Sequence, residues 1–390
     1  MSLRLAGAGG AVVLPADAGL VRGLTDCLFG WPMDFAPDLP SAEEALAVIA
    51  SEVGGTFRLG SRHLDSPMTG LTTTSAVCAV IADLALGFCA ALSDGIGLHC
   101  GAVRLGEGPL MLVAGTHRAG KSTLVARLAL DDGAEVFCDD VLPINSEGEA
   151  IALGIAPRLR LPAVAALNGR IEPQLILGDD RYAYLRPKRP ALHGTRARPV
   201  VLVALDRRPG NGPPCLHRME KDVAIRLVLQ QTLTSLRNTE AALLRAEALL
   251  AGMICVTLRY DDLNAAVALL AARFGADRCE NMGDFAPPVL AALEQGGKVA
   301  LPHVRLSRRR DVHIRNQESG VFLWHLDSPM LWHLNALGQK IWMLLETPQT
   351  PHAIAQLLSC AFAQVDPDLI LADVTAFLGA AQQDGLVEPA

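Results

Sequence analysis

A glycine-rich loop at residues 115–123 carries the clearest chemical signal in this chain. Residues 115–122 fit the pattern G-x-x-x-x-G-K-S/T, and two apolar runs, Leu110–Ala114 and Leu124–Leu130, flank the loop. In such loops, backbone N–H groups and a helix N-terminus bind phosphates, the lysine reaches the β- and γ-phosphates, and the hydroxyl binds Mg²⁺. A plain glycine turn is the alternative, but it rarely needs a lysine and two hydroxyls together. The sequence therefore predicts a site for ATP (or GTP) and Mg²⁺, formed by Gly115, His117, Arg118, Ala119, Gly120, Lys121, Ser122 and Thr123.

Two acidic residues and a histidine add groups that phosphoryl transfer needs. The run Glu135–Val141 predicts a short strand that ends in the paired carboxylates Asp139 and Asp140, one helix after the loop. One carboxylate can hold Mg²⁺ while the other accepts the proton of an attacking hydroxyl. His99 lies in a strand-like segment before a turn at residues 106–108. Taken alone, this histidine would more often be a satisfied core residue.

Together these residues resemble the HPr kinase family, bacterial serine kinases in which a histidine-bearing hairpin precedes the nucleotide loop and a strand ending Asp-Asp follows it. The resemblance covers roughly residues 96–275, where Pro157–Leu161 and Val256–Tyr260 also look like strands of compact relatives. It implies roles for the following catalytic and metal-binding residues: Asp139 as general base, Lys121 at the phosphates, Asp140 with Ser122 as the metal site, and His99 as a neighbour that orients or tunes the base. One departure is the acidic loop with which the family docks its protein substrate. Residues 154–157 stand roughly in its place and contain no acidic residue, which argues against HPr itself as the substrate.

The last 80 residues follow a different pattern, with three short strands before three helices. Strands are predicted at Val312–Arg315, Val321–Leu326 and Met330–Leu334, because turn residues separate these apolar runs. The first helix is predicted at about 336–345, and the next two begin at Thr350-Pro351 and Asp366-Pro367, a cap followed by proline at the first helical position. Apolar side chains at helical spacing should bury one face of each of these two helices: Ile354, Leu357, Leu358 and Phe362 on one, and Ile370, Val374, Phe377 and Leu378 on the other.

This arrangement, over about residues 311–390, resembles the PqqD family, also called precursor-recognition elements. Its members bind the leader segment of a ribosomally made peptide while a partner enzyme modifies that peptide. In the family the leader adds as a strand to the third β-strand and packs against the last helix. The resemblance implies a peptide site at Met330, Leu331, Trp332, His333, Leu334, Val374, Phe377 and Leu378. An ordinary winged-helix-like module for dimerisation or DNA is the alternative, although the net charge of −7 argues against broad contact with nucleic-acid phosphates.

Composition indicates a cytoplasmic protein with well-developed cores. The chain has 390 residues, of which 51% are hydrophobic and 19% charged, enough material for two to three domains. The nine cysteines form no C-x-x-C pair, so we expect reduced core cysteines rather than disulfides or zinc. The longest apolar stretch, residues 76–92, contains Asp83 and Gly87 and is short for a membrane span, which favours a buried helix. No signal peptide is expected.

The fold class predicted is an α/β P-loop kinase domain of the HPr kinase type, a mixed sheet flanked by helices, followed by a small α+β winged-helix-like domain of three strands and three helices. The expected divisions are an N-terminal region at 1–95 packed on the kinase, the nucleotide-binding domain at 96–279, a connector at 280–310, and the leader-recognition domain at 311–390. The predicted function is ATP-dependent phosphorylation of a ribosomally synthesised peptide on a Ser or Thr hydroxyl. Two alternatives stay open, a nucleotide-gated leader-binding protein that transfers no phosphate and a kinase of a small molecule or free amino acid. Whether the chain forms homo-oligomers also stays open.

Overall fold

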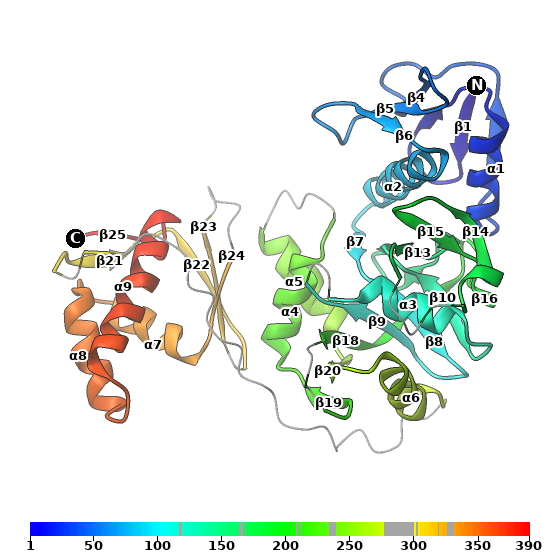
Figure 1. The fold of residues 1–390 in the computed structure, drawn as a ribbon. Helices are drawn as coiled ribbons and strands as arrows, with labels where there is room; N and C mark the ends of the chain where they lie inside the picture. Colours follow the sequence, from blue (N-terminus) through cyan, green and yellow to red (C-terminus); the bar gives the residue numbers. More distant parts are fainter. Residues whose placement is uncertain are drawn as a thin grey trace. The chain divides into compact units, whose positions relative to one another are not determined.

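The computed structural model of this chain describes residues 1–116, 119–163, 167, 169–207, 210, 212–233, 239–276, 300–301, 303–318, 320–325 and 331–390. Two compact units are present (Figure 1). The first comprises Met1–Met219, Leu227–Ser235 and Arg245–Pro288, and the second comprises Glu220–Arg226, Leu236–Leu244 and Val289–Ala390. Each unit is described by itself. The architecture is therefore an α/β unit and a smaller α+β unit.

The N-terminal part of the first unit is a six-stranded sheet with two helices. Across the sheet its strands are β3 (Met33–Ala36), β1 (Ser2–Leu5), β2 (Ala11–Val13), β4 (Ala45–Ser51), β5 (Phe57–Ser61) and β6 (Met68–Leu71). The helices are α1 (Ala18–Cys27) and α2 (Thr73–Ala91), which pack against each other. Among the described residues, α2 is the one helix long and apolar enough to span a membrane, but 56% of its apolar window is buried inside the protein. Its contacts with β4 and β5 agree with the predicted core helix.

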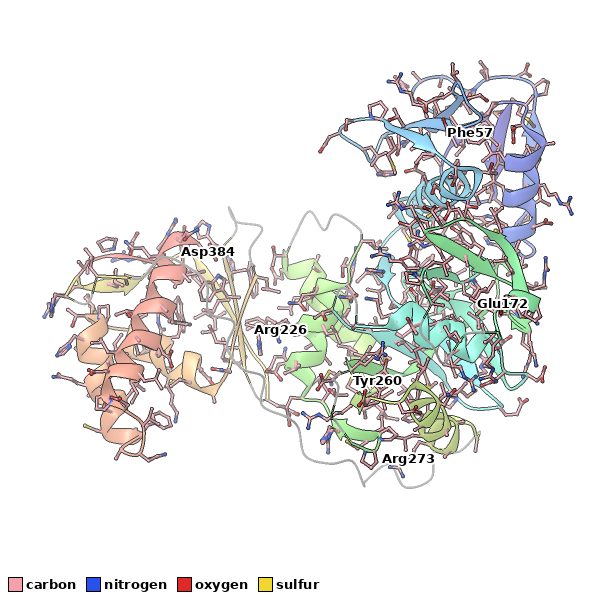
Figure 2. All side chains as sticks on the ribbon, in the orientation of Figure 1. Phe57, Glu172, Arg226, Tyr260, Arg273 and Asp384 are labelled. Atoms are coloured by element: carbon pink, nitrogen blue, oxygen red, sulfur yellow. The ribbon has the colours of Figure 1, made fainter. Side chains whose placement is uncertain are left out.

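A seven-stranded mixed sheet forms the centre of the first unit. Its strands in spatial order are β16 (Arg189–Pro190), β10 (Ala134–Cys138), β8 (Gly101–Leu105), β9 (Leu110–Ala114), β18 (Pro199–Arg207), β20 (Ile254–Tyr260) and β19 (Cys215–Arg218). The central strands β9, β18 and β20 are parallel. Helices α3 (Lys121–Ala129) and α6 (Leu263–Phe274) pack on this core, in which Tyr260, labelled in Figure 2, is fully buried. Strand β9 is entirely apolar and buried, as expected for a strand covered on both faces, whereas β20 alternates between buried and half-buried residues.

Two smaller sheets adjoin the central one in the first unit. The first runs β17 (Arg196–Ala197), β12 (Ala150–Ile151), β11 (Val141–Ile144) and β7 (Ile96–His99). The second runs β13 (Arg158–Arg160), β15 (Tyr182–Leu185) and β14 (Leu175–Gly178). The predicted strands at 157–161 and 256–260 are confirmed as β13 and β20. Helices α4 (Lys221–Gln230) and α5 (Thr239–Leu250) complete the helical elements before the C-terminal part.

The C-terminal part of the second unit has the three strands and three helices that the sequence predicts. Strands β22 (Val312–Asn316), β23 (Val321–His325) and β24 (Leu331–Leu334) form an antiparallel sheet in that order. Helices α7 (Ala336–Leu344), α8 (Pro351–Ala361) and α9 (Pro367–Gln383) follow. The caps are also as predicted, since Thr350 accepts from Ala353 N–H and Asp366 from Asp368 N–H.

Two details of this unit differ from the sequence prediction. Strand β21 (Leu306–Arg308) pairs with β25 (Val387–Pro389), so part of the segment expected to be a connector belongs to the folded unit. Leu357, expected on the buried face of α8, is 52% exposed, whereas Ile354 and Leu358 are in the core. Helical spacing gives the direction of the buried face, but the width of that face depends on what packs against it.

Candidate functional site

The predicted nucleotide loop lies between β9 and α3, at the carboxyl end of a parallel strand. Gly120 precedes the helix with φ of +98°, a left-handed conformation that glycine adopts without steric cost. Space also requires glycine here, because a Cβ at Gly120 would lie 3.2 Å from the Tyr260 hydroxyl oxygen. Gly120 offers no side-chain acceptor to the first turn of α3. Amide groups at such a helix end are ordinarily satisfied by caps, water or an anion.

Lys121 is the first residue of α3, and its side chain points back into the loop. Only 7% of the residue is exposed, and Nζ donates a hydrogen bond to the Gly115 carbonyl at 2.9 Å. Burial lowers the pKa of Lys121, while the nearby Asp140 and Asp139 oppose that effect. A buried cation at this position is suited to contact an anion. His117 and Arg118 lie outside the described residues.

The carboxylates are brought to the loop because two neighbouring segments of chain change sheets at the same place. The chain passes from β7 to β8 at Cys100 and from β10 to β11 at Asp139 and Asp140, each time between the four-stranded and the seven-stranded sheet. Val141 is the register partner of His99, and the Cys138 thiol lies 3.1 Å from the Cys100 carbonyl oxygen. The sequence-predicted residues His99, Asp139 and Asp140 therefore meet at this junction.

Asp140 is held by two basic side chains. Its Oδ1 lies 3.1 Å from His99 Nε2, and its Oδ2 lies 3.1 Å from a guanidinium nitrogen of Arg158. Burial alone would raise the pKa of Asp140, but the hydrogen bond from His99 and the charge of Arg158 outweigh it and lower the pKa. Asp140 is therefore an ionised carboxylate in a fixed orientation.

Asp139 has a different environment. It is 6% exposed, and its Oδ2 accepts a hydrogen bond from the Arg158 backbone N–H at 3.0 Å. Burial and then the charge of Asp140 raise its pKa to about 6. The Ser122 hydroxyl acts in the opposite direction but does not reach hydrogen-bonding geometry, so Asp139 Oδ1 has no partner among the described residues. A carboxylate with a raised pKa and a free oxygen can accept a proton near neutral pH.

The resemblance implies that His99 is a neighbour that orients or tunes the general base Asp139. In the structure His99 is paired with Asp140, the residue next to that base. The reason is register, since His99 stands opposite Val141 and so lies nearer the second carboxylate than the first.

Arg158 is a site residue that sequence reasoning missed. Besides its contacts with both aspartates, its guanidinium contacts the Cys78 thiol of α2 and lies 5.2 Å from the centre of the Tyr182 ring. The sequence feature that could have pointed to it is an arginine inside the predicted strand Pro157–Leu161. Its partner Cys78 is 80 residues away in the sequence and could not be found from spacing.

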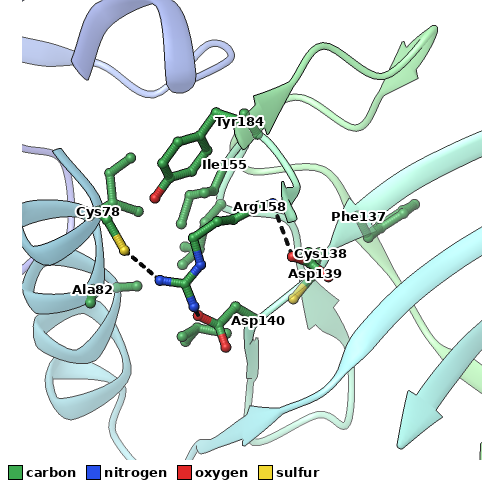
Figure 3. Close-up of a pocket in the computed structure, with 14 residues that line it drawn as sticks. Cys78, Ala82, Phe137, Cys138, Asp139, Asp140, Ile155, Arg158 and Tyr184 are labelled. Carbon is green, nitrogen blue, oxygen red and sulfur yellow. Dashed lines mark hydrogen bonds and ion pairs between the residues drawn. The ribbon is translucent and has the colours of Figure 1, made fainter. Parts of the chain in front are cut away.

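A pocket lies beside these groups (Figure 3). Its polar lining consists of Asp139, Asp140 and Arg158, with Tyr184 next to them. The remaining lining is mostly small or apolar: Cys78, Ile81, Ala82, Ala85, Phe137, Cys138, Val141, Leu153, Ile155 and Ala156. Helix α2 of the N-terminal region supplies four of these side chains.

Residues 154–157 have a structural role. Gly154 has φ of +70°, and its carbonyl accepts a hydrogen bond from Phe29 N–H at 2.5 Å. Ala156 N–H donates to the Cys27 carbonyl at 2.8 Å. Residues 154–157 therefore fasten the central part of the unit to the end of α1.

The predicted peptide site in the second unit contains both half-buried and fully buried side chains. Trp332 of β24 and Phe377 of α9 meet edge to face at 5.6 Å, and Trp332 Nε1 donates to Asp384 at 2.8 Å. Val374 and Leu378 are instead 1% and 0% exposed and belong to the core.

The other predicted residues of the peptide site lie along β24. Leu331 is half-buried, Leu334 is buried, and the His333 ring lies 5.0 Å from that of Phe322. Met330 lies outside the described residues. Strand β24 is at one side of its sheet, with β23 as its neighbour.

Comparison with known proteins finds a family match within the second unit. Residues 320–387 match the family described as "Coenzyme PQQ synthesis protein D (PqqD)". The second unit contains a PqqD domain. A solved structure described as "TbiB1 in Complex with the TbiA(beta) Leader Peptide" is 30% identical over 21% of this chain and 94% of that chain, with a TM-score of 0.20. No curated protein matches the chain.

Proposed function

We propose that this protein is an ATP-dependent kinase that phosphorylates a ribosomally synthesised precursor peptide on a Ser or Thr hydroxyl, and that its PqqD domain binds the leader of that peptide. The observation that carries the proposal is a pair of carboxylates that line one pocket, Asp139 buried and Asp140 half-buried, with the buried loop lysine Lys121 near both, in a chain that also contains a PqqD domain. The position of β24 at one side of its sheet supports a peptide partner, because an extended segment can add there as a further strand.

The chemistry follows from the different environments of the two carboxylates. Asp139, with a pKa of about 6, takes the proton of the acceptor hydroxyl. The acceptor oxygen then bonds to the γ-phosphorus of ATP as the bond to the β,γ-bridging oxygen breaks, which yields the phosphopeptide and ADP. Lys121 neutralises charge on the phosphates, and the loop amides orient them.

The donor set also suits Mg²⁺, which takes oxygen ligands. Ser122 supplies a hydroxyl and Asp140 a carboxylate that stays ionised because its pKa is lowered, as a metal ligand must. His99 and Arg158 orient that carboxylate. When bound, the ion would neutralise phosphate charge.

The leader would add to the edge of β24, with Trp332 and Phe377 at the adjoining surface of α9. Main-chain hydrogen bonds then supply affinity, and the aromatic pair offers a contact for apolar leader side chains. Leader capture raises the local concentration of the acceptor to about the millimolar range for a short flexible linker.

The decisive experiment is mass spectrometry of the small peptide encoded next to this protein's gene, after incubation with the protein, ATP and Mg²⁺. A gain of one phosphate supports the proposal. An unchanged peptide mass together with nucleotide hydrolysis refutes it and favours nucleotide-gated leader binding. Transfer that persists in full after removal of residues 311–390 would refute the role assigned to the PqqD domain.

A further inference from the structure

Helix α2 forms one wall of the pocket that contains the carboxylates (Figure 3). Cys78, Ile81, Ala82 and Ala85 line this wall, a spacing that places them on one face of the helix. The opposite wall contains Asp139, Asp140 and Arg158. A segment with no recognisable chemical motif therefore contacts the reacting groups.

The pocket beside the carboxylates is separate from the described part of the nucleotide loop. Helix α2, other small or apolar side chains and the carboxylates line it, and no described residue of the loop does. Asp139, 6% exposed, is part of this lining.

We propose that this pocket is the acceptor site and that α2 determines which acceptors fit. The inference rests on the proposed kinase function and adds the chemistry of the substrate. The site takes a small hydroxyl-bearing residue, flanked in the peptide by an apolar side chain that packs on Ala82 and Ile81. A strongly acidic acceptor segment is disfavoured, because Asp139 and Asp140 both face the pocket.

Arg158 is a positioning residue in this arrangement. It contacts the Cys78 thiol on α2, the Asp140 carboxylate, and, through its backbone N–H, Asp139. These contacts fix the distance between the α2 wall and the carboxylates. The N-terminal region is consequently part of the active site.

Filling the pocket from α2 tests the inference. Ala82→Phe places an aromatic ring in the pocket, and we expect kcat/KM for the neighbouring-gene peptide to fall at least about tenfold. The affinity for a fluorescent ATP analogue should change less than about twofold, because no described residue of the nucleotide loop lines the pocket. Ala90→Phe is the matched control, since Ala90 is exposed on the same helix and does not line the pocket. It should retain parent kcat/KM and parent thermal stability.

The outcomes separate this inference from the proposed function. A parent protein that transfers no phosphate to the peptide refutes the kinase function. A parent that transfers phosphate, with an Ala82→Phe protein that does so equally well, overturns only the acceptor site.

A footprint on the unmodified protein covers the case in which Ala82→Phe fails to fold. Cys78 lines the pocket, and Cys360 is an exposed free cysteine in the second unit. We expect the peptide to slow iodoacetamide labelling of Cys78 at least about fivefold and to leave Cys360 labelling unchanged, as read by mass spectrometry of tryptic fragments. Equal labelling of Cys78 with and without saturating peptide would overturn the inference, as would a Cys78 that the reagent does not reach.

Discussion

Replacing Asp139 with asparagine should make the protein more stable and much less active. Burial, followed by the charge of Asp140, raises the pKa of Asp139 from 3.8 to about 6. A shift of about two units corresponds to about 3 kcal/mol of free energy. At low pH the carboxyl is protonated in both folded and unfolded states. As the pH rises from 3.8 to about 6, the unfolded state ionises first and the folded state loses stability relative to it.

Asparagine cannot ionise, so the stability of the D139N protein does not fall in this way as the pH rises. We expect it to exceed the parent in free energy of unfolding by up to about 3 kcal/mol at pH 8 and by roughly half of that at pH 5. Phosphate transfer should fall by roughly a hundredfold to ten-thousandfold, because the amide accepts no proton from the acceptor hydroxyl.

Urea unfolding followed by circular dichroism between pH 5 and pH 8 measures the difference between the two proteins. Asp132→Asn is the matched control, since this side chain is 86% exposed and pairs with Lys188 at the surface. Its effect should stay within about 1 kcal/mol at every pH. A D139N protein whose stability advantage is the same at pH 5 and pH 8, or that transfers phosphate at the parent rate, would refute the reasoning.

Three further substitutions probe the remaining parts of the site. Lys121→Ala removes the buried cation of the loop. It should weaken binding of a fluorescent ATP analogue at least about tenfold and nearly abolish phosphate transfer. Phosphate transfer at the parent rate in this variant would show that the loop is not a nucleotide site. Asp140→Asn should raise the Mg²⁺ concentration needed for the half-maximal rate. It also removes a negative charge that raises the pKa of Asp139, so the acidic limb of the pH–rate profile should shift to lower pH. If Asp139→Asn raises the Mg²⁺ requirement instead, the two carboxylates exchange roles. Phe377→Asp should lower the leader affinity measured by fluorescence polarisation at least about tenfold. Leu369→Asp should not lower it, because Leu369 is exposed on the same helix. Equal leader affinities of the two variants would exclude α9 from the peptide site.

Local features of the sequence predicted much of the fold. The loop before Lys121, the strand that ends just before Asp139, and the caps at Thr350 and Asp366 each depend on residues close together in the chain. Such features follow from backbone preferences and hydrogen bonding within a few residues. They could therefore be placed to within one or two residues.

Features that depend on distant contacts could not be predicted. The partners of Arg158 come from α2 and from the junction of two sheets, and no local periodicity encodes that meeting. Helical spacing placed Val374, Phe377 and Leu378 on one face of α9, but it could not show that Val374 and Leu378 are fully buried while Phe377 is half-buried and meets Trp332 at the margin of the core. Fully buried and half-buried side chains give the same sequence pattern.

The pairing of β21 with β25 affects how the C-terminal part could be exchanged by protein engineering. The first and last strands of the PqqD-containing part lie side by side, and its apolar core includes side chains from both, Leu306 and Val387. This part is not the whole unit, however, because Glu220–Arg226 belongs to the same unit and Asp222 Oδ2 lies 2.5 Å from His333 Nε2. The residues before position 96 are also joined to the rest of the first unit, because their core contains Leu153, Ala156 and Tyr184. An engineer who wishes to redirect this protein to a new peptide should therefore exchange the part that begins before Leu306 together with its contact at Asp222.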